Sequence, residues 1–300
     1  MNIHSMKGGG TLLKESFSAW YNRDPFRSSA VISYYTIFSL PGLFVIVINL
    51  AGYFYGTEAL TNQVSAQIAD VIGTEEAQQI EGIIANAYTG GGLTWSSIIS
   101  IATLIFGATG VFYQVQQDLN RIWKVQPSPD RMILNFLRER LISFGMILAI
   151  GFLLLVSLII SSLISSFSNW LSINFFGLID ELLKLVDIVI SLGVITLLFA
   201  AIFKILPDAK IRWGDVWIGA FITSILFVIA KFLLGLYFGY SDPGSIYGAA
   251  GSIILIMLWT TYSGIILLFG AEFTCVYTKH KGRKIEAEKY AIPLDEPEKE

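Results

Sequence analysis

The chain has 300 residues, of which 54% are hydrophobic and only 14% are charged, and its formal net charge is −3. Soluble domains carry roughly 25% charged residues. This chain also repeats apolar runs long enough to cross a bilayer, so its composition excludes an ordinary soluble domain. The single cysteine, Cys275, excludes an intrachain disulfide. The two histidines, His4 and His280, lie in the two tails and cannot build a histidine-rich metal site inside the fold.

The N-terminal segment, residues 1–28, is predicted to be cytoplasmic and amphipathic. Its large apolar side chains recur at helical spacing, at Leu13, Phe17, Trp20 and Tyr21. That pattern is typical of a short helix lying at a membrane surface. Asp24-Pro25 predicts the start of the next helix, because Asp caps free backbone N–H groups and Pro suits the first helical turn.

The apolar runs predict an all-α fold: a polytopic membrane protein with six transmembrane helices. The transmembrane domain is 29–278, with spans at about 29–55, 95–117, 141–165, 182–206, 214–238 and 247–277. The first span contains Pro41-Gly42, a candidate hinge, because proline removes a backbone hydrogen bond and favours a kink. The long connection 56–94 predicts two short extracytoplasmic amphipathic helices between the first and second spans.

The basic residues are segregated by loop. Of the 20 Lys and Arg residues, 18 lie in the N-terminal segment, the 118–140 connection, the 204–212 turn or the tail 279–300. The positive-inside rule then places both termini in the cytoplasm. The charged cytoplasmic tail is weakly apolar, and we expect it to be disordered after Ile285.

Asp187, Lys231 and Glu272 are ionisable residues inside predicted spans, where burying a charge is costly. Asp187 and Lys231 lie at similar depth, so an ion pair between them is expected. Glu272 lies near the cytoplasmic side, and its expected partners are the basic residues closest to that side: Arg121, Arg138, Arg140 or Lys204. For Lys231 and Glu272 two roles stay open, a structural ion pair or a place in a substrate or proton pathway. Glu272 could also be an interfacial acid with neither role.

The cytoplasmic end of the second span is unusually polar, with Gln114, Gln117, Asp118 and Arg121 close together. Asp118 and Arg121 are i, i+3 neighbours and can neutralise one another. A water-filled vestibule and a simple interfacial helix end fit this cluster equally well.

Small residues recur in the last span, including Gly248, Gly251 and Gly270. Glycines let helices approach closely, so close packing and a hinge role are both open for them. Gly235 and Gly239 could pack within one chain or between two copies, which leaves a homo-oligomer open.

No catalytic motif is present: the sequence lacks GxSxG, HExxH and a Walker-type loop. We therefore expect no enzyme activity, no cofactor and no metal site. The basic clusters follow from membrane topology alone, so nucleic-acid binding is not expected.

Four stretches together carry a family resemblance: SYYTIFSLPGLF (33–44), GATGVFYQVQQDLNRIWKV (107–125), ILPDAKIRWGDVWIGAFITSILFVIAKFLLGLY (205–237) and YGAAGSIILIMLWTTYSGIILLFGAEFT (247–274). They resemble the YihY/virulence factor BrkB family of bacterial inner-membrane proteins, over about residues 10–280. The resemblance implies six helices, cytoplasmic termini and residence in the plasma membrane. Part of that family once carried a ribonuclease label, but no cluster here could hold a catalytic metal on the cytoplasmic side.

Two functions are carried forward. The first is a transporter, or an exporter of lipids or envelope components, that works in the lipid bilayer on an unidentified small-molecule or lipid substrate. It predicts a cavity that is lined by the first, second, fifth and sixth spans and contains Glu272 or Lys231. The second is a non-catalytic structural or assembly protein of the bacterial envelope.

Overall fold

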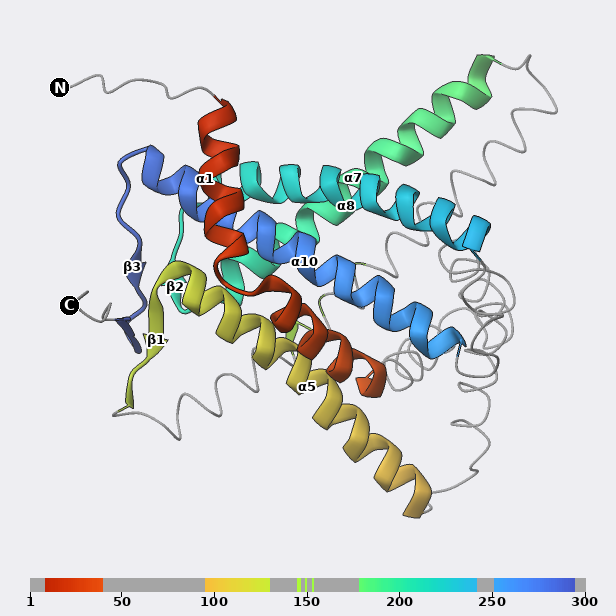
Figure 1. The fold of residues 1–300 in the computed structure, drawn as a ribbon, viewed down its shortest axis with the longest axis horizontal. Coiled ribbons are helices and arrows are strands. Elements are labelled where there is room, and N and C mark those ends of the chain that lie inside the picture. The colour runs from red at the N-terminus through yellow and green to blue at the C-terminus, as the bar shows by residue number, and fades with distance from the viewer. Residues whose placement is uncertain are drawn as a thin grey trace.

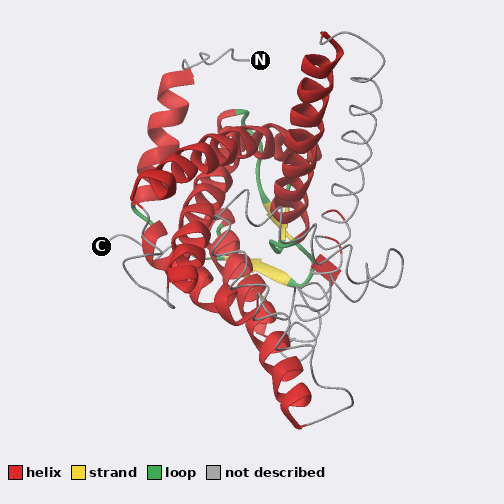
Figure 2. Ribbon diagram, turned by 90° about the vertical axis from the view of Figure 1, so that its right-hand side faces the viewer, coloured by secondary structure: helices red, strands yellow, loops and turns green. Residues whose placement is uncertain are grey.

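The computed structural model describes residues 9–39, 95–129, 178–241 and 251–294, together with residues 145, 146, 149 and 153. Its long helices are α1 (Gly9–Tyr21), α5 (Trp95–Trp123), α7 (Leu178–Ile205), α8 (Trp213–Ser241) and α10 (Gly251–His280), and residues 25–39 form a further helix (Figure 1). Four short strands accompany them: β1 (Val125–Pro127), β2 (Ala209–Lys210), β3 (Glu286–Ala287) and β4 (Ala291–Pro293). Helices dominate the described chain, as predicted, and the strands are small additions to it (Figure 2).

Within the described ranges, three helical segments are long and apolar enough to cross a membrane: Ile188–Ile205, Trp213–Tyr237 and Ile253–His280. They coincide with the last three predicted spans. α5 and the helix over 25–39 coincide with the second span and the start of the first. The predicted helices of 56–94, the rest of the first span and nearly all of the third lie outside the described residues. The six-span count therefore stays a prediction.

α10 is the element that connects the others. It packs against α8, α1 and α5, and α8 in turn packs against α7. In Figure 1, α1 crosses α10 toward the C-terminal end of α10. The chain then turns so that residues 25–39 run beside α5. This helix approaches α5 closely at two glycines of α5. A Cβ at Gly107 would overlap the backbone at Ser39, and a Cβ at Gly110 would overlap the ring of Tyr35.

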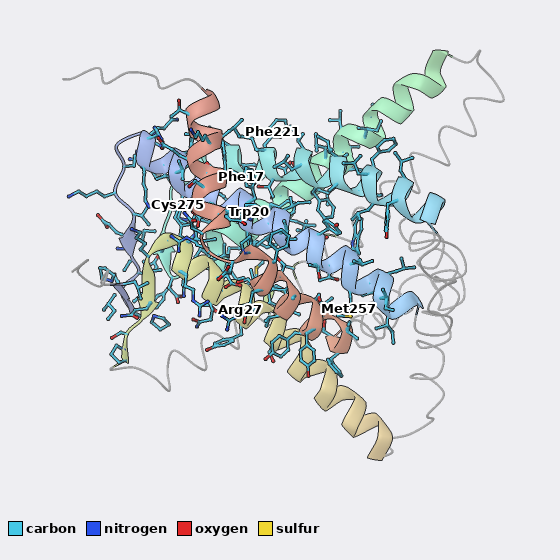
Figure 3. All side chains as sticks on the ribbon, in the orientation of Figure 1. Phe17, Trp20, Arg27, Phe221, Met257 and Cys275 are labelled. Carbon is cyan, nitrogen blue, oxygen red and sulfur yellow. The ribbon has the colours of Figure 1, made fainter. Side chains whose placement is uncertain are left out.

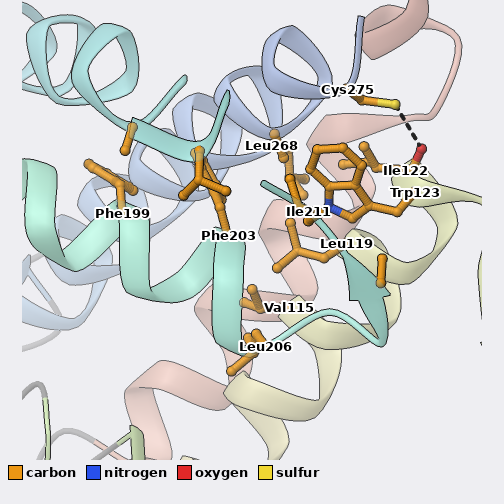
Figure 4. Close-up of a cluster of buried hydrophobic side chains, with 14 of the residues drawn as sticks. Val115, Leu119, Ile122, Trp123, Phe199, Phe203, Leu206, Ile211, Leu268 and Cys275 are labelled. Atoms are coloured by element: carbon orange, nitrogen blue, oxygen red, sulfur yellow. Dashed lines mark hydrogen bonds between the residues drawn. The ribbon is translucent and has the colours of Figure 1, made fainter. Parts of the chain in front are cut away.

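The best-packed part of the described bundle lies toward the ends where α5, α7 and α10 finish. Buried apolar side chains from these helices and from the turn after α7 meet there, among them Leu119, Ile122, Phe199, Phe203, Leu206, Ile211 and Leu268 (Figure 4). The buried thiol of Cys275 donates to the carbonyl oxygen of Ile122 at 3.4 Å, which links α10 to α5. This cluster holds the C-terminal end of α5 against α10.

α8 and α10 are joined by a reciprocal glycine–threonine contact. A Cβ at Gly219 would overlap the side chain of Thr274, and a Cβ at Gly270 would overlap the side chain of Thr223. Each threonine hydroxyl donates at 2.7 Å to the carbonyl of the glycine four residues before it in its own helix. The polar atoms are thus satisfied within each helix, and the glycines let the two backbones approach. Gly270 therefore packs against α8, whereas Gly235 faces open space.

Residues 286–294 of the tail are ordered, so the prediction of disorder after Ile285 is wrong for these residues. Gly282, at φ +68°, ends α10: its N–H bonds to Lys279 O, and Arg283 N–H bonds to Thr278 O. Glycine adopts this left-handed conformation without steric cost. The turn directs Arg283 back onto the buried carboxylate of Asp215, at the start of α8.

Beyond Arg283 the tail is held by backbone hydrogen bonds. β3 pairs with β2 in the turn between α7 and α8, and β4 pairs with β1 at the end of α5, both antiparallel. Further bonds run from Glu288 N to Asp208 O and from Leu294 N to Lys124 O, both at 2.9 Å. The tail therefore joins the ends of α5, α7, α8 and α10. The composition of the tail could not reveal this, because backbone groups make the bonds.

The glycine–threonine contact predicts opposite outcomes for two Gly→Ala substitutions in α8. Gly219→Ala forces α8 and α10 apart and should cost about 1–3 kcal/mol of stability, because Thr274 already occupies the space. Gly235→Ala is the control, since nothing lies within 4 Å of an added Cβ. Thermal unfolding in detergent, followed by size-exclusion chromatography, should show a lower midpoint for the first variant alone. Equal midpoints would contradict the packing.

The tail predicts a second pair of outcomes. A chain that ends after Lys284 loses β3 and β4, and each lost backbone hydrogen bond contributes about 1 kcal/mol. Its thermal midpoint should fall by several degrees. A chain that ends after Leu294 keeps both strands and should unfold like the full-length protein. If both truncations behave like the full chain, the strands do not stabilise the bundle.

Candidate functional site

A cavity of about 160 Å³ lies where α1, the helix over 25–39, α5 and α10 meet. It is lined by charged, polar and apolar side chains together: Trp20, Arg23, Pro25, Ser28, Asp118, Arg121, Ile122, Leu268 and Glu272. A cavity of this size holds several water molecules or a small polar group. Two guanidinium groups and two carboxylates face it, so their formal charges cancel.

The central contact of the cavity is an ion pair between Arg23 Nε and Glu272 Oε1. The Glu272 side chain is 3% exposed and projects from an otherwise apolar helix, whereas the Arg23 side chain is 34% exposed. Arg23 also donates from Nη1 to the carbonyl oxygen of Arg121 at 2.6 Å. Glu272 Oε1 lies against Arg23 without hydrogen-bond geometry and has no hydrogen bond within the described chain. The Arg23 charge compensates this buried oxygen, and the adjoining cavity leaves room beside the carboxylate for a water molecule or a polar ligand group.

Asp118 forms the opposite wall, one residue beyond the predicted second span. It accepts hydrogen bonds from Ser28 Oγ and Gln114 Nε2, both at 3.0 Å, and Arg121 Nη1 lies 3.7 Å from Oδ1. Burial raises the pKa of the Asp118 carboxyl above its ordinary value. The two hydrogen bonds and the Arg121 charge partly oppose that rise. Asp118 thus joins the helix over 25–39 to α5, and Arg121 extends from it toward solvent.

Arg23 is positioned by the way α1 is fastened to α10. Trp20 Nε1 donates to Ile265 O at 3.2 Å, and its ring meets Phe269 edge to face at 6.0 Å between centroids. Midway along α1, Glu15 contacts His280. α1 ends at Tyr21, and the chain passes through Asp24, at φ +50°, into the next helix. This turn leaves Arg23 over Glu272.

A second buried polar cluster joins α5 to the turn after α7 and does not line the cavity. Asn120 Nδ2 donates to the Asp208 carboxylate at 2.8 Å, and the Asp208 backbone N–H donates to Asn120 Oδ1 at 2.8 Å. Gln116 Nε2 lies 3.3 Å from both Asp208 carboxylate oxygens. Since the same turn carries β2, this cluster and the tail stabilise the same end of the bundle.

Several predicted site residues come together here. Glu272, Asp118 and Arg121 line the cavity, and Gln114 supports Asp118, whereas Gln117 is half-buried and lines no wall of it. The expected partners of Glu272 are wrong among the described residues, because Arg23 takes that place. Lys204 instead donates to Ile211 O at 2.6 Å and lies over the ring of Trp213. Arg138 and Arg140 lie outside the described residues.

Of the remaining predicted residues, those that the structure describes do not line this cavity. Lys231 is exposed on α8, and the side chain of Asp187 lies outside the described residues, so their ion pair stays a prediction. Pro41, Gly42 and Gly248 also lie outside them, and Gly251 is the first residue of α10. Of the residues described, no group of three or more His, Cys, Asp and Glu side chains could hold a metal ion.

Sequence reasoning missed Arg23, Ser28 and Trp20 as members of the site. Arg23 was counted only as a topological charge, because it lies between two helices and outside every predicted span. A signal was available: an arginine beside a predicted helix start, in a segment expected at the same membrane boundary as Glu272. Distance along the chain hid the pairing, since 249 residues separate the two.

The model of the family described as virulence factor BrkB matches residues 16–293, which is most of the chain. The chain belongs to this family. The BrkB match includes every residue that lines the cavity. No solved structure matches the chain.

Three similar proteins carry the name UPF0761 membrane protein. A UPF0761 membrane protein of Alteromonas mediterranea is 31% identical over 187 residues, which are 62% of this BrkB chain and 60% of that protein. Another from Aeromonas salmonicida is 27% identical over 254 residues, 82% of each chain. A third, from Tolumonas auensis, is 31% identical over 178 residues, 59% of this chain and 56% of that one. The match thus spans less than two thirds of the first and third relatives.

The polar cluster of Gln116, Asn120 and Asp208 predicts that a substitution at Asn120 lowers stability, whereas one at Gln117 does not. Asn120→Leu removes the hydrogen bonds to Asp208 and should cost about 1–3 kcal/mol of stability, because it leaves buried polar groups unsatisfied. Gln117→Leu, three residues earlier on α5, is the control, since Gln117 is only half-buried. Thermal midpoints in detergent measure both. Equal midpoints for Asn120→Leu and the parent protein would contradict the role of the cluster.

Proposed function

We propose that the protein is a transporter, or an exporter of lipids or envelope components, of the bacterial plasma membrane, with both termini in the cytoplasm. The cavity around Glu272 receives the polar part of the substrate. We also propose that it is not an enzyme. The observation that carries the proposal is the buried Glu272 carboxylate, which projects from an apolar helix into a polar cavity and is paired there with Arg23.

The composition of the cavity supports this proposal. A purely structural ion pair gains most from a dry, closely packed site with every polar atom satisfied. Here water-sized space adjoins the pair, and both arginines are partly exposed. A substrate bearing charge can therefore reach Arg23 and Arg121 and compete with the carboxylates for them. The helix over 25–39, α5 and α10 line the cavity, as expected of the first, second and sixth spans, whereas α8 does not.

A second function, a structural or assembly protein of the envelope, is favoured by a specific observation. Asp118 has three partners and Glu272 has Arg23, so each carboxylate in the cavity already faces a cation. In that case the cluster fixes the positions of α1, α5 and α10, and the surfaces of the protein carry the function. The two functions differ in what neutralising Glu272 does.

Flux through reconstituted vesicles distinguishes them. The probes are fluorescent phospholipids and a panel of small organic anions, cations and zwitterions. For a transported probe, Glu272→Gln should lower the initial rate at least tenfold, about 1.4 kcal/mol, while most of the protein stays folded. Glu286→Gln, an exposed carboxylate on β3, is the control and should leave the rate unchanged. A thermal midpoint lowered by Glu272→Gln, with no probe moved by the parent protein, would favour the structural function instead.

A further inference from the structure

α1 carries a row of exposed apolar side chains. Leu13, Phe17 and Tyr21 are 50%, 56% and 62% exposed, and Phe26, just after the turn, is 57% exposed. The first three are spaced four residues apart, so they share one side of the helix. The rings of Phe17 and Tyr21 stack with their centroids 6.3 Å apart. Large aromatic side chains exposed in this way form a continuous apolar strip.

The other two sides of α1 have different surroundings. Ser16 and Trp20 are buried against the bundle, and Trp20 is the residue fastened to α10. Thr11, Lys14 and Ser18 form an exposed polar side. α1 thus has one side for protein, one apolar side and one polar side. The neighbouring apolar and polar sides are the two faces of a helix that lies in the boundary between a bilayer and water, and the third side attaches this helix to the bundle.

The direction of α1 fits that boundary. α10 is apolar enough to cross a membrane, and α1 crosses α10 instead of running along it (Figures 1 and 3). Figure 3 shows Trp20 and Phe17 where the two helices meet. The crossing lies toward the end of the bundle that carries the basic C-terminal turn of α10, the end predicted to be cytoplasmic.

The charges beside the strip identify its partner. Lys14 and Arg27 are exposed on either side of the turn, and neither has an ion pair within the described chain. Of the nearby acids, Glu15 contacts His280, and Asp24 is exposed. Unpaired cations at the edge of an aromatic strip suit anionic phospholipid headgroups above acyl chains. A second copy of this chain would have to bury the same two cations.

We propose that the Leu13–Phe17–Tyr21 side of α1, with Phe26, binds the anionic lipid surface of the cytoplasmic leaflet, and that Lys14 and Arg27 contact the headgroups. The proposal is independent of transport. In this arrangement α1 lies in the membrane interface. It is attached to α10 through Trp20, two residues before the turn that carries Arg23.

Spin-label accessibility in lipid nanodiscs tests this on the full chain. Cys275→Ser gives a background without thiols, in which Phe17→Cys and Ser18→Cys each carry one label. The two positions are adjacent, both exposed, and lie on different sides of α1. In nanodiscs of phosphatidylcholine and phosphatidylglycerol, the ratio of oxygen to nickel-chelate accessibility should be several-fold higher at 17 than at 18.

A second comparison varies the charge of the lipid and removes the charges of Lys14 and Arg27. The ratio at 17 should fall in phosphatidylcholine alone, and Lys14→Gln with Arg27→Gln should remove the difference between the two lipid mixtures. Three outcomes would overturn the proposal. They are equal ratios at 17 and 18, an identical ratio at 17 in both lipid mixtures, and protection of 17 from both reagents, which would indicate a protein partner such as a second copy.

Discussion

The Arg23–Glu272 ion pair is the interaction on which the arrangement of the described helices depends. Glu272 is almost completely buried in an apolar helix, and an uncompensated buried charge costs several kcal/mol. The chain supplies the compensating cation from a turn at the opposite end of the sequence. To bring Arg23 to Glu272, α1 must cross α10, and Trp20 holds the two helices together at the crossing. The chain then turns at Asp24 into the next helix. Arg23 also bonds to the end of α5, so one side chain relates three helices.

The two parts of the bundle are stabilised by different forces. Within the membrane-spanning segments, α8 and α10 approach through glycines and satisfy their hydroxyl groups internally, as helices in lipid must. Toward the ends where the tail folds back, buried polar groups are paired between elements: Asn120 with Asp208, Arg283 with Asp215, and the tail strands with β1 and β2. The cavity lies on the polar side of this division. The elements around the cavity are thus held in place by paired polar groups.

Much of the fold followed from the sequence, and the residues show why the rest did not. Apolar run length predicted the three long apolar helices correctly, because a run of that length can cross a bilayer only as a helix, which satisfies its own backbone groups. The i, i+3 contact of Asp118 with Arg121 was predictable because helix geometry fixes it. The partner of Glu272 was not, because it depends on the angle at which α1 crosses α10. The order of the tail was also hidden, since its backbone makes the bonds and its side chains do not reveal them.

The energetic coupling between Arg23 and Glu272 can be measured with a double-mutant cycle. Stability is measured by equilibrium unfolding in mixed micelles for the parent protein, Arg23→Gln, Glu272→Gln and the double variant. Because water partly screens Arg23, which is about one third exposed, we expect a coupling energy of about 1–2 kcal/mol, below that of a fully buried pair. The double variant should then be less destabilised than the sum of the single variants. Additivity within about 0.5 kcal/mol would contradict the claim that Arg23 compensates the charge of Glu272.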